Sequence, residues 1–91
     1  MTNAIGMTRD EIFDVVRKVL VDLFDIEDGA INRDFRFVDG DRDEWDLIEV
    51  LSWIEERLSK GSRTFEFSDE EAAEIDTVGD AVDTIFEKLN E

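Results

Sequence analysis

The residues of this chain that could do chemistry are carboxylates, because its 91 residues include 26 Asp and Glu but no His and no Cys. Without imidazole or thiol groups the chain cannot build hydrolase triads or the usual zinc sites, and it contains no Gly-rich phosphate loop. Paired carboxylates could still perform acid–base catalysis if a pocket brought them together. A small domain offers little room for such a pocket, so we expect a protein that is not an enzyme.

The densest run of potential metal ligands is Asp39-Gly40-Asp41-Arg42-Asp43, in which carboxylates alternate along the chain. An EF-hand loop beginning at Asp39 would need Gly at its sixth position and Glu at its twelfth, where this sequence has Glu44 and Val50. A specific calcium loop is therefore disfavoured, and we predict no metal centre. Loose binding of divalent ions, or a solvated run of charge, fits the sequence better.

The formal net charge of −16 restricts the partners that this chain can bind. Nucleic acid carries charge of the same sign and is therefore disfavoured. The acidic surface favours a basic protein surface instead, and its self-repulsion favours a monomer. The first residues, MTNAIGMTRDEIF, have neither a basic start nor a long apolar stretch, so we expect no signal peptide, no membrane span and a cytoplasmic location.

Four helices are expected to position the carboxylates, because apolar residues recur at helical spacing in three stretches and a capping box opens a fourth, short helix. The first is predicted to span about residues 9–25, and the second begins at the Asp43 cap and includes Leu58. The third runs from Ser68 to about Glu74, and the fourth follows the Thr77 cap and includes Leu89. Each begins at a residue that can cap a helix N-terminus, and these caps are Thr8, Asp43, Ser68 and Thr77. Gly61 is expected to end the second helix.

A chain of this length can enclose a single core but not two, so we predict one helical domain over residues 8–91 after a flexible N-terminus of residues 1–7. Its fold class is all-α, a four-helix bundle with three longer helices, one short helix and a long loop after the first. We expect three apolar residues to pin that loop, residues 26–40, to the core: Ile31, Phe35 and Phe37. Phe65 and Phe67 of a later extended segment are expected to seal one end of the core.

The order of these elements, and the residues at their joints, resemble the acyl carrier protein family, small acidic bundles that carry acyl groups on a phosphopantetheine arm. The stretch from Phe67 to Ala72, which reads FSDEEA, resembles a Pro-Asp-Glu-Glu-Ala-like turn of the family. The stretch from Ile75 to Val78, IDTV, resembles its Thr-Val helix start. The resemblance covers about residues 8–90 and implies the acyl-carrier-protein-like bundle.

The functional motif of that family is Asp-Ser-Leu at the start of the second helix, and it aligns here with Asp43-Glu44-Trp45. Glu44 thus occupies the position of the serine that would bear phosphopantetheine. A carboxylate cannot replace the hydroxyl that forms the stable phosphodiester. The resemblance therefore implies a carrier-like protein without a cofactor, and we expect no phosphopantetheine at Glu44. Attachment to another serine stays an alternative, the serines being Ser52, Ser59, Ser62 and Ser68.

The second helix carries both tryptophans, and steps of about 100° per residue place Trp45 and Trp53 on a ridge away from its main apolar face. We predict a partner-binding face on this helix, in which carboxylates steer the encounter and the indoles supply the desolvated contacts. Its predicted residues are Asp43, Glu44, Trp45, Asp46, Glu49, Trp53, Glu55 and Glu56. The partner would present a basic surface, and the resemblance implies an enzyme of acyl, polyketide or peptide assembly.

Two other functions and one other interpretation of the tryptophans fit the same residues. The chain could be a working carrier with an atypical attachment residue, or an acidic inhibitor or immunity protein that blocks a basic partner. The indoles could also pack on the chain itself, Trp45 on the 26–40 loop and Trp53 on Phe65 or Phe67.

Overall fold

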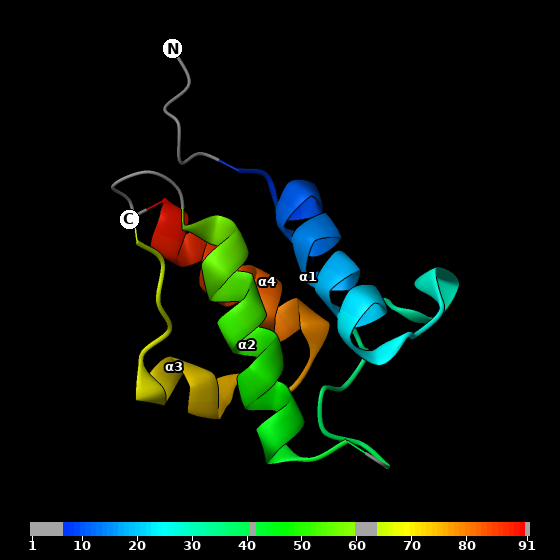
Figure 1. Ribbon diagram of the computed structural model, residues 1–91. Coiled ribbons are helices and arrows are strands. Elements are labelled where there is room, and N and C mark those ends of the chain that lie inside the picture. The colour runs from blue at the N-terminus through cyan, green and yellow to red at the C-terminus, as the bar shows by residue number, and fades with distance from the viewer. Residues whose placement is uncertain (1–6, 41, 60–63, 91) are drawn as a thin grey trace.

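A computed structural model describes residues 7–40, 42–59 and 64–90, which form the helical bundle of Figure 1. Its elements are, in chain order, α1 (Arg9–Phe24), a one-turn 3-10 helix η1 (Asp28–Ala30), α2 (Glu44–Leu58), α3 (Asp69–Glu74) and α4 (Val78–Leu89). Helix α1 packs against both α2 and α4, while the short α3 runs across one end of the bundle. The predicted all-α fold, with three longer helices and one short helix, is confirmed.

Reciprocal capping hydrogen bonds explain where the helices begin. At the start of α1, the Thr8 hydroxyl accepts from the Glu11 amide at 3.1 Å and the Thr8 amide donates to the Glu11 carboxylate at 2.9 Å. The other three helices begin with the same arrangement, which confirms the predicted caps at Asp43, Ser68 and Thr77. Helix α2 ends at Leu58, and the predicted terminator Gly61 lies outside the described residues.

The core lies where α1, α2 and α4 meet, and aliphatic residues dominate it. Side chains with no exposed surface come from all three helices: Ile12, Val16, Val19, Leu20, Val50, Ile54, Val78, Ala81, Val82 and Ile85. Burial of each Val, Leu or Ile side chain contributes about 1.5–3 kcal/mol. Met7 also packs against this core, whereas residues 1–6 lie outside the described part of the chain, so the division before residue 8 stays a prediction.

The long connection between α1 and α2 is fixed to the start of α4 by backbone hydrogen bonds. The Phe37 amide donates to the Asp76 carbonyl at 3.1 Å, the Val78 amide to Phe35 at 2.9 Å, and the Gly79 amide to Arg33 at 2.9 Å. Two of these donors belong to the first turn of α4, where a helix leaves amides without intrahelical partners. Ile31 and Phe37 are buried and Phe35 is half-buried, as predicted.

Arg42 holds the last part of this connection and so fixes the approach to α2. Its Nε donates to the Phe37 carbonyl at 3.1 Å and its Nη2 to the Arg36 carbonyl at 2.9 Å. Its guanidinium also lies 4.7 Å from the centre of the Phe35 ring, within range of a cation–π contact. The N-terminus of α2 is therefore held by the same segment that docks on α4.

At one end of the bundle, Phe65 and Phe67 meet edge to face with ring centres 5.2 Å apart and planes at 87°. Phe65 is 5% exposed and Phe67 half-buried, which confirms that the pair seals the core. Lys88 of α4 pairs with Glu71 of α3 at 3.0 Å beside them. Short α3 is thereby tied to α4.

Glu71 gives α3 a dependence on pH. A hydrogen bond from the Ser68 amide lowers the pKa of Glu71; burial opposes that effect and Lys88 adds to it, leaving the pKa below its ordinary value of 4.5. The stabilisation is therefore complete above pH 4.5 and is lost as the pH falls through the lowered pKa. We expect Glu71→Gln to reduce the unfolding free energy by about 0.5–1 kcal/mol at neutral pH, with the difference from wild type shrinking in acid.

Urea unfolding of both proteins at several acidic pH values measures this difference directly. The matched control is Glu70→Gln, which removes a charge from the same turn at an exposed position. A wild-type advantage over Glu71→Gln that stayed constant throughout the acid range would contradict the expectation.

Candidate functional site

The N-terminus of α2 is built by two of the predicted partner-binding carboxylates. One oxygen of Asp43 accepts from the Trp45 amide at 3.0 Å and from the Asp46 amide at 3.2 Å. The Asp46 carboxylate in turn accepts a hydrogen bond from the Asp43 amide at 3.0 Å. These two carboxylates therefore order the first turn of α2, and the adjacent Glu44 side chain is left exposed at the positive end of the helix dipole.

Two large apolar side chains project from this first part of α2. Trp45 is 76% exposed and Ile48 is 52% exposed, and together with Asp43 and Glu44 they line a hollow of about 340 Å³. The interpretation in which Trp45 packs on the 26–40 loop is wrong, because most of its surface meets solvent. Contiguous exposed apolar surface rimmed by polar groups is typical of interaction sites.

Ile48 is a site residue that the sequence prediction missed. It lies at the edge of the apolar face of α2, so helical periodicity alone assigns it to the core as readily as to the surface. The signal that could have found it is its spacing of three residues from Trp45, which places both side chains on neighbouring parts of one helix face.

A groove of about 370 Å³ lies between α2 and α3, next to this hollow. Apolar residues from both helices and the following turn form its walls: Leu47, Ile48, Leu51, Ala72, Ala73 and Ile75. Glu44 and Asp69 are the charged residues that line it. The groove can hold an apolar group beside two carboxylates.

The rest of the predicted face is less uniform. Trp53 is 36% exposed and lies two turns after Trp45, about 12 Å along the helix axis. Glu49 and Glu56 are exposed. Glu55 is half-buried and accepts a hydrogen bond from the Phe67 amide at 2.8 Å, so it faces the chain's own 65–67 segment. The structure thus gathers Asp43, Glu44, Trp45 and Ile48 and separates Glu55 from them.

No group of three or more carboxylates is arranged to hold a metal ion within the described ranges, from which Asp41 is missing. The expected absence of a metal centre stays a prediction. In the same ranges, no helix combines the length and the apolar character needed to cross a bilayer.

Comparison with known proteins gives the relatives of this chain. It is 35% identical to an acyl carrier protein of Petrotoga mobilis over 85 residues, which is 92% of this chain and 94% of that protein. The chain belongs to the acyl carrier protein family. It is also 34% identical to the acyl carrier protein of Lactobacillus acidophilus over 80 residues, 87% of this chain and 94% of the relative. It is 33% identical to the acyl carrier protein of Picosynechococcus over 79 residues, which is 86% of this chain and 91% of that relative.

No family model matches the chain, so its place among acyl carrier proteins rests on these relatives. The predicted resemblance is confirmed, and the helical bundle is the fold that it implied. Glu44 stands exposed between the capping Asp43 and the exposed Trp45.

Proposed function

We propose that this member of the acyl carrier protein family is a non-catalytic interaction module that works without phosphopantetheine. It docks through α2 on a basic surface of an enzyme of acyl, polyketide or peptide assembly. The observation that carries the proposal is the first part of α2, where Trp45 and Ile48 are 76% and 52% exposed beside the carboxylate of Glu44.

Glu44 supports the absence of the prosthetic group. It aligns with the serine of the Asp-Ser-Leu motif, and its carboxylate lacks the hydroxyl on which a phosphodiester could be built. An acidic residue in a first helical turn stabilises the helix by about 0.3–1 kcal/mol, so the fold does not require serine there. The cap formed by Asp43 and Asp46 keeps the first turn in place.

The other serines differ in their availability. Ser68 caps α3 by accepting from the Glu71 amide at 3.1 Å. Ser59 donates to the Glu55 carbonyl at 2.8 Å and accepts from the Phe65 amide at 2.9 Å. Ser52 is exposed on α2, and Ser62 lies outside the described residues. Among the serines that the structure describes, Ser52 is therefore the one best placed to serve an atypical carrier.

The composition of the α2 face fits a basic partner. Carboxylates on an acidic protein accelerate encounter with a positive surface, and exposed tryptophans are enriched among the residues that carry binding energy. A net charge of −16 also supports a cytoplasmic monomer that avoids nucleic acid. Binding to the partner should therefore weaken as salt concentration rises.

Replacement of Trp45 by Ala is expected to weaken partner binding at least tenfold while changing the unfolding free energy by less than about 0.5 kcal/mol. The reason is its 76% exposure, which leaves little packing to lose on truncation. Trp53→Ala should behave similarly, with a somewhat larger effect on stability because Trp53 is 36% exposed. Affinity capture from the source cell, followed by titration of the purified partner, measures both effects.

Val38→Ala is the control, because Val38 is an apolar residue outside α2 whose exposure of 37% is close to the 36% of Trp53. Undiminished binding by both tryptophan variants would contradict the docking face. A large loss of stability in Trp53→Ala would show instead that its indole belongs to the core. If the main partner proved to be a nuclease or toxin, the acidic-inhibitor function would replace the proposed one.

The names of the relatives favour a second candidate function, that of a working acyl carrier with an atypical attachment residue. Exposed Ser52 is the observation on this chain that fits it. Intact-mass measurement after modification separates this candidate from the first.

A further inference from the structure

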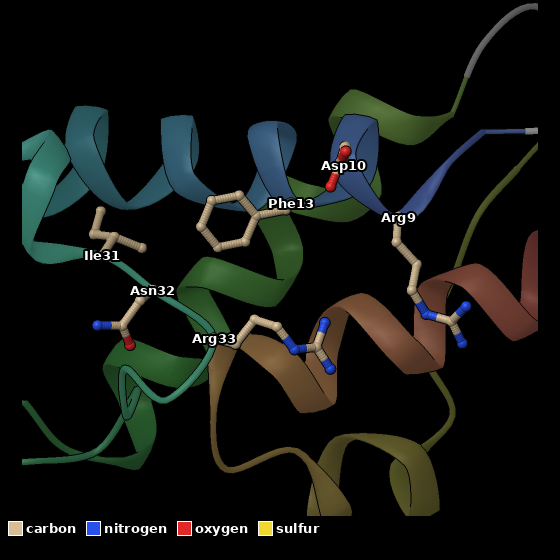
Figure 2. A pocket seen from close by; sticks show the side chains of 6 residues that line it. All are labelled: Arg9, Asp10, Phe13, Ile31, Asn32 and Arg33. Atoms are coloured by element: carbon tan, nitrogen blue, oxygen red, sulfur yellow. The ribbon is translucent and has the colours of Figure 1, made fainter.

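A second cleft lies away from the groove between α2 and α3, between the N-terminal turns of α1 and the segment that follows η1 (Figure 2). Its volume is about 300 Å³, within the range of small-molecule sites. The residues that line it combine cationic, amide and apolar groups: Arg9, Asp10, Phe13, Ile31, Asn32 and Arg33. Nothing in the proposed docking function uses these residues.

Two arginines of the cleft share a single carboxylate, that of Asp83 on α4. Arg9 Nε lies 3.1 Å from Asp83 Oδ1, and Arg33 Nη2 lies 3.1 Å from Oδ2 and 3.3 Å from Oδ1. Burial raises the pKa of Asp83, but the hydrogen bonds from Arg9 and Arg33 outweigh it and lower the pKa overall. Arg9 and Arg33 therefore share one ionised carboxylate at neutral pH, and Asp10 on the rim of the cleft supplies a second negative charge.

Both guanidinium groups are held in place yet remain accessible. Their side chains are 51% and 54% exposed for Arg9 and Arg33. The Arg9 guanidinium lies 4.1 Å from the centre of the Phe86 ring. Arg33 lies over Gly79, where a Cβ atom would stand 3.2 Å from Arg33 Nη2 and 3.1 Å from the Arg33 carbonyl. Absence of a side chain at Gly79 thus lets Arg33 settle on α4, and binding need not order either arginine from a free state.

Apolar and amide groups complete the cleft. The Phe13 ring points from α1 toward the 31–33 segment in Figure 2, and Ile31 beside it is 6% exposed. Asn32 accepts from the Asp34 amide through Oδ1 at 2.9 Å, which assigns its amide nitrogen as a hydrogen-bond donor toward other groups. Asp10 on the rim is the one lining residue whose charge opposes an anion.

We propose that this cleft binds a small amphipathic carboxylate, with its aryl or alkyl group against Phe13 and Ile31 and its carboxylate on the guanidinium N–H groups of Arg9 and Arg33 that Asp83 does not use. The bound carboxylate would accept charge-assisted hydrogen bonds from these N–H groups. A matching alcohol would keep the apolar contacts but lose these bonds. Charge is therefore what should select the ligand.

The test is an NMR titration of the full chain with 3-phenylpropionate and, separately, with 3-phenylpropan-1-ol. We expect 3-phenylpropionate to shift the amide signals of residues 9–13, 31–33 and Asp83 saturably, and the alcohol to bind at least tenfold more weakly. Equal affinity for the alcohol would overturn the proposal. So would signals that moved mainly on α2 and α3, or no saturable shift with either compound.

Three variants test whether positive charge in the cleft favours binding of 3-phenylpropionate and negative charge opposes it. Arg33→Met should weaken 3-phenylpropionate binding about tenfold, and its backbone carbonyl still accepts from Gly79. Asp10→Asn should strengthen binding about two- to fivefold, because it removes the opposing charge. Arg57→Met is the matched control, since Arg57 pairs with Asp22 at 2.8 Å and does not line the cleft.

If Arg33→Met fails to fold, binding of 3-phenylpropionate by Asp10→Asn still tests the proposal. Unchanged or weaker binding by Asp10→Asn overturns the proposal, and so does a loss in Arg57→Met equal to that in Arg33→Met. Because none of the residues that line the cleft belongs to α2, failure here leaves the docking proposal intact.

Discussion

Co-expression with a phosphopantetheinyl transferase is expected to leave the intact mass of the wild-type protein unchanged, whereas the Glu44→Ser variant gains a phosphopantetheine-sized addition. The outcome is all-or-none because the reaction needs a hydroxyl at this position. Glu44 is exposed in the first turn of α2, and the cap from Asp43 to the amides of Trp45 and Asp46 does not involve its side chain. A serine placed there would present its hydroxyl on an ordered helix start.

Intact-mass spectrometry reads both results, with Glu44→Gln as the matched control that removes the charge without adding a hydroxyl. A phosphopantetheine-sized addition to the wild type would defeat the proposed function. In that event, loss of the addition in Ser52→Ala would identify the atypical attachment residue. An unmodified Glu44→Ser protein would contradict the alignment of Glu44 with the motif serine.

Phe37→Ala is expected to produce the largest loss of stability among the substitutions considered, about 3–5 kcal/mol of unfolding free energy. Phe37 is 1% exposed, so truncation removes a large buried ring and leaves a cavity. The same residue donates its amide to Asp76 and accepts at its carbonyl from Arg42. Since domains of this size are stable by roughly 5–15 kcal/mol, the variant should be close to unfolding at 37 °C.

Urea denaturation followed by far-ultraviolet circular dichroism measures the loss. The neighbouring Val38→Ala is its control, because Val38 is 37% exposed and should lose less than about 0.5 kcal/mol. A loss below about 1 kcal/mol in Phe37→Ala would mean that the segment before α2 is not part of the cooperative core.

Local signals in the sequence predicted the helices well. Each capping box joins residues three apart, so Thr8 with Glu11 and Ser68 with Glu71 could be recognised without knowledge of the fold. Phe37 was predicted as an anchor because it is a large apolar residue in an otherwise polar segment. Burial of such a side chain is favoured wherever the segment lies.

Contacts between distant segments could not be predicted in the same way. Arg9 and Asp83 are separated by 74 positions and Arg33 and Asp83 by 50, and no local pattern joins them. Ile48 is exposed because α3 leaves an open groove beside it, which depends on how the bundle packs. Helical periodicity predicts Glu55 on the outer face of α2, whereas its carboxylate accepts a hydrogen bond from the Phe67 amide. Helical periodicity predicts the direction of each side chain around its own helix. Which segments those side chains contact depends on how the helices and loops pack together.

The docking of the 33–37 segment on the start of α4 also limits how the length of this chain can vary. Carbonyls of Arg33 and Phe35 and the amide of Phe37 alternate along the segment, and each meets a fixed partner within residues 76–79. An insertion or deletion of one residue here would put at least one of these groups out of register. Closely related chains of this architecture should therefore keep these five positions without gaps and accept length changes elsewhere in the connection.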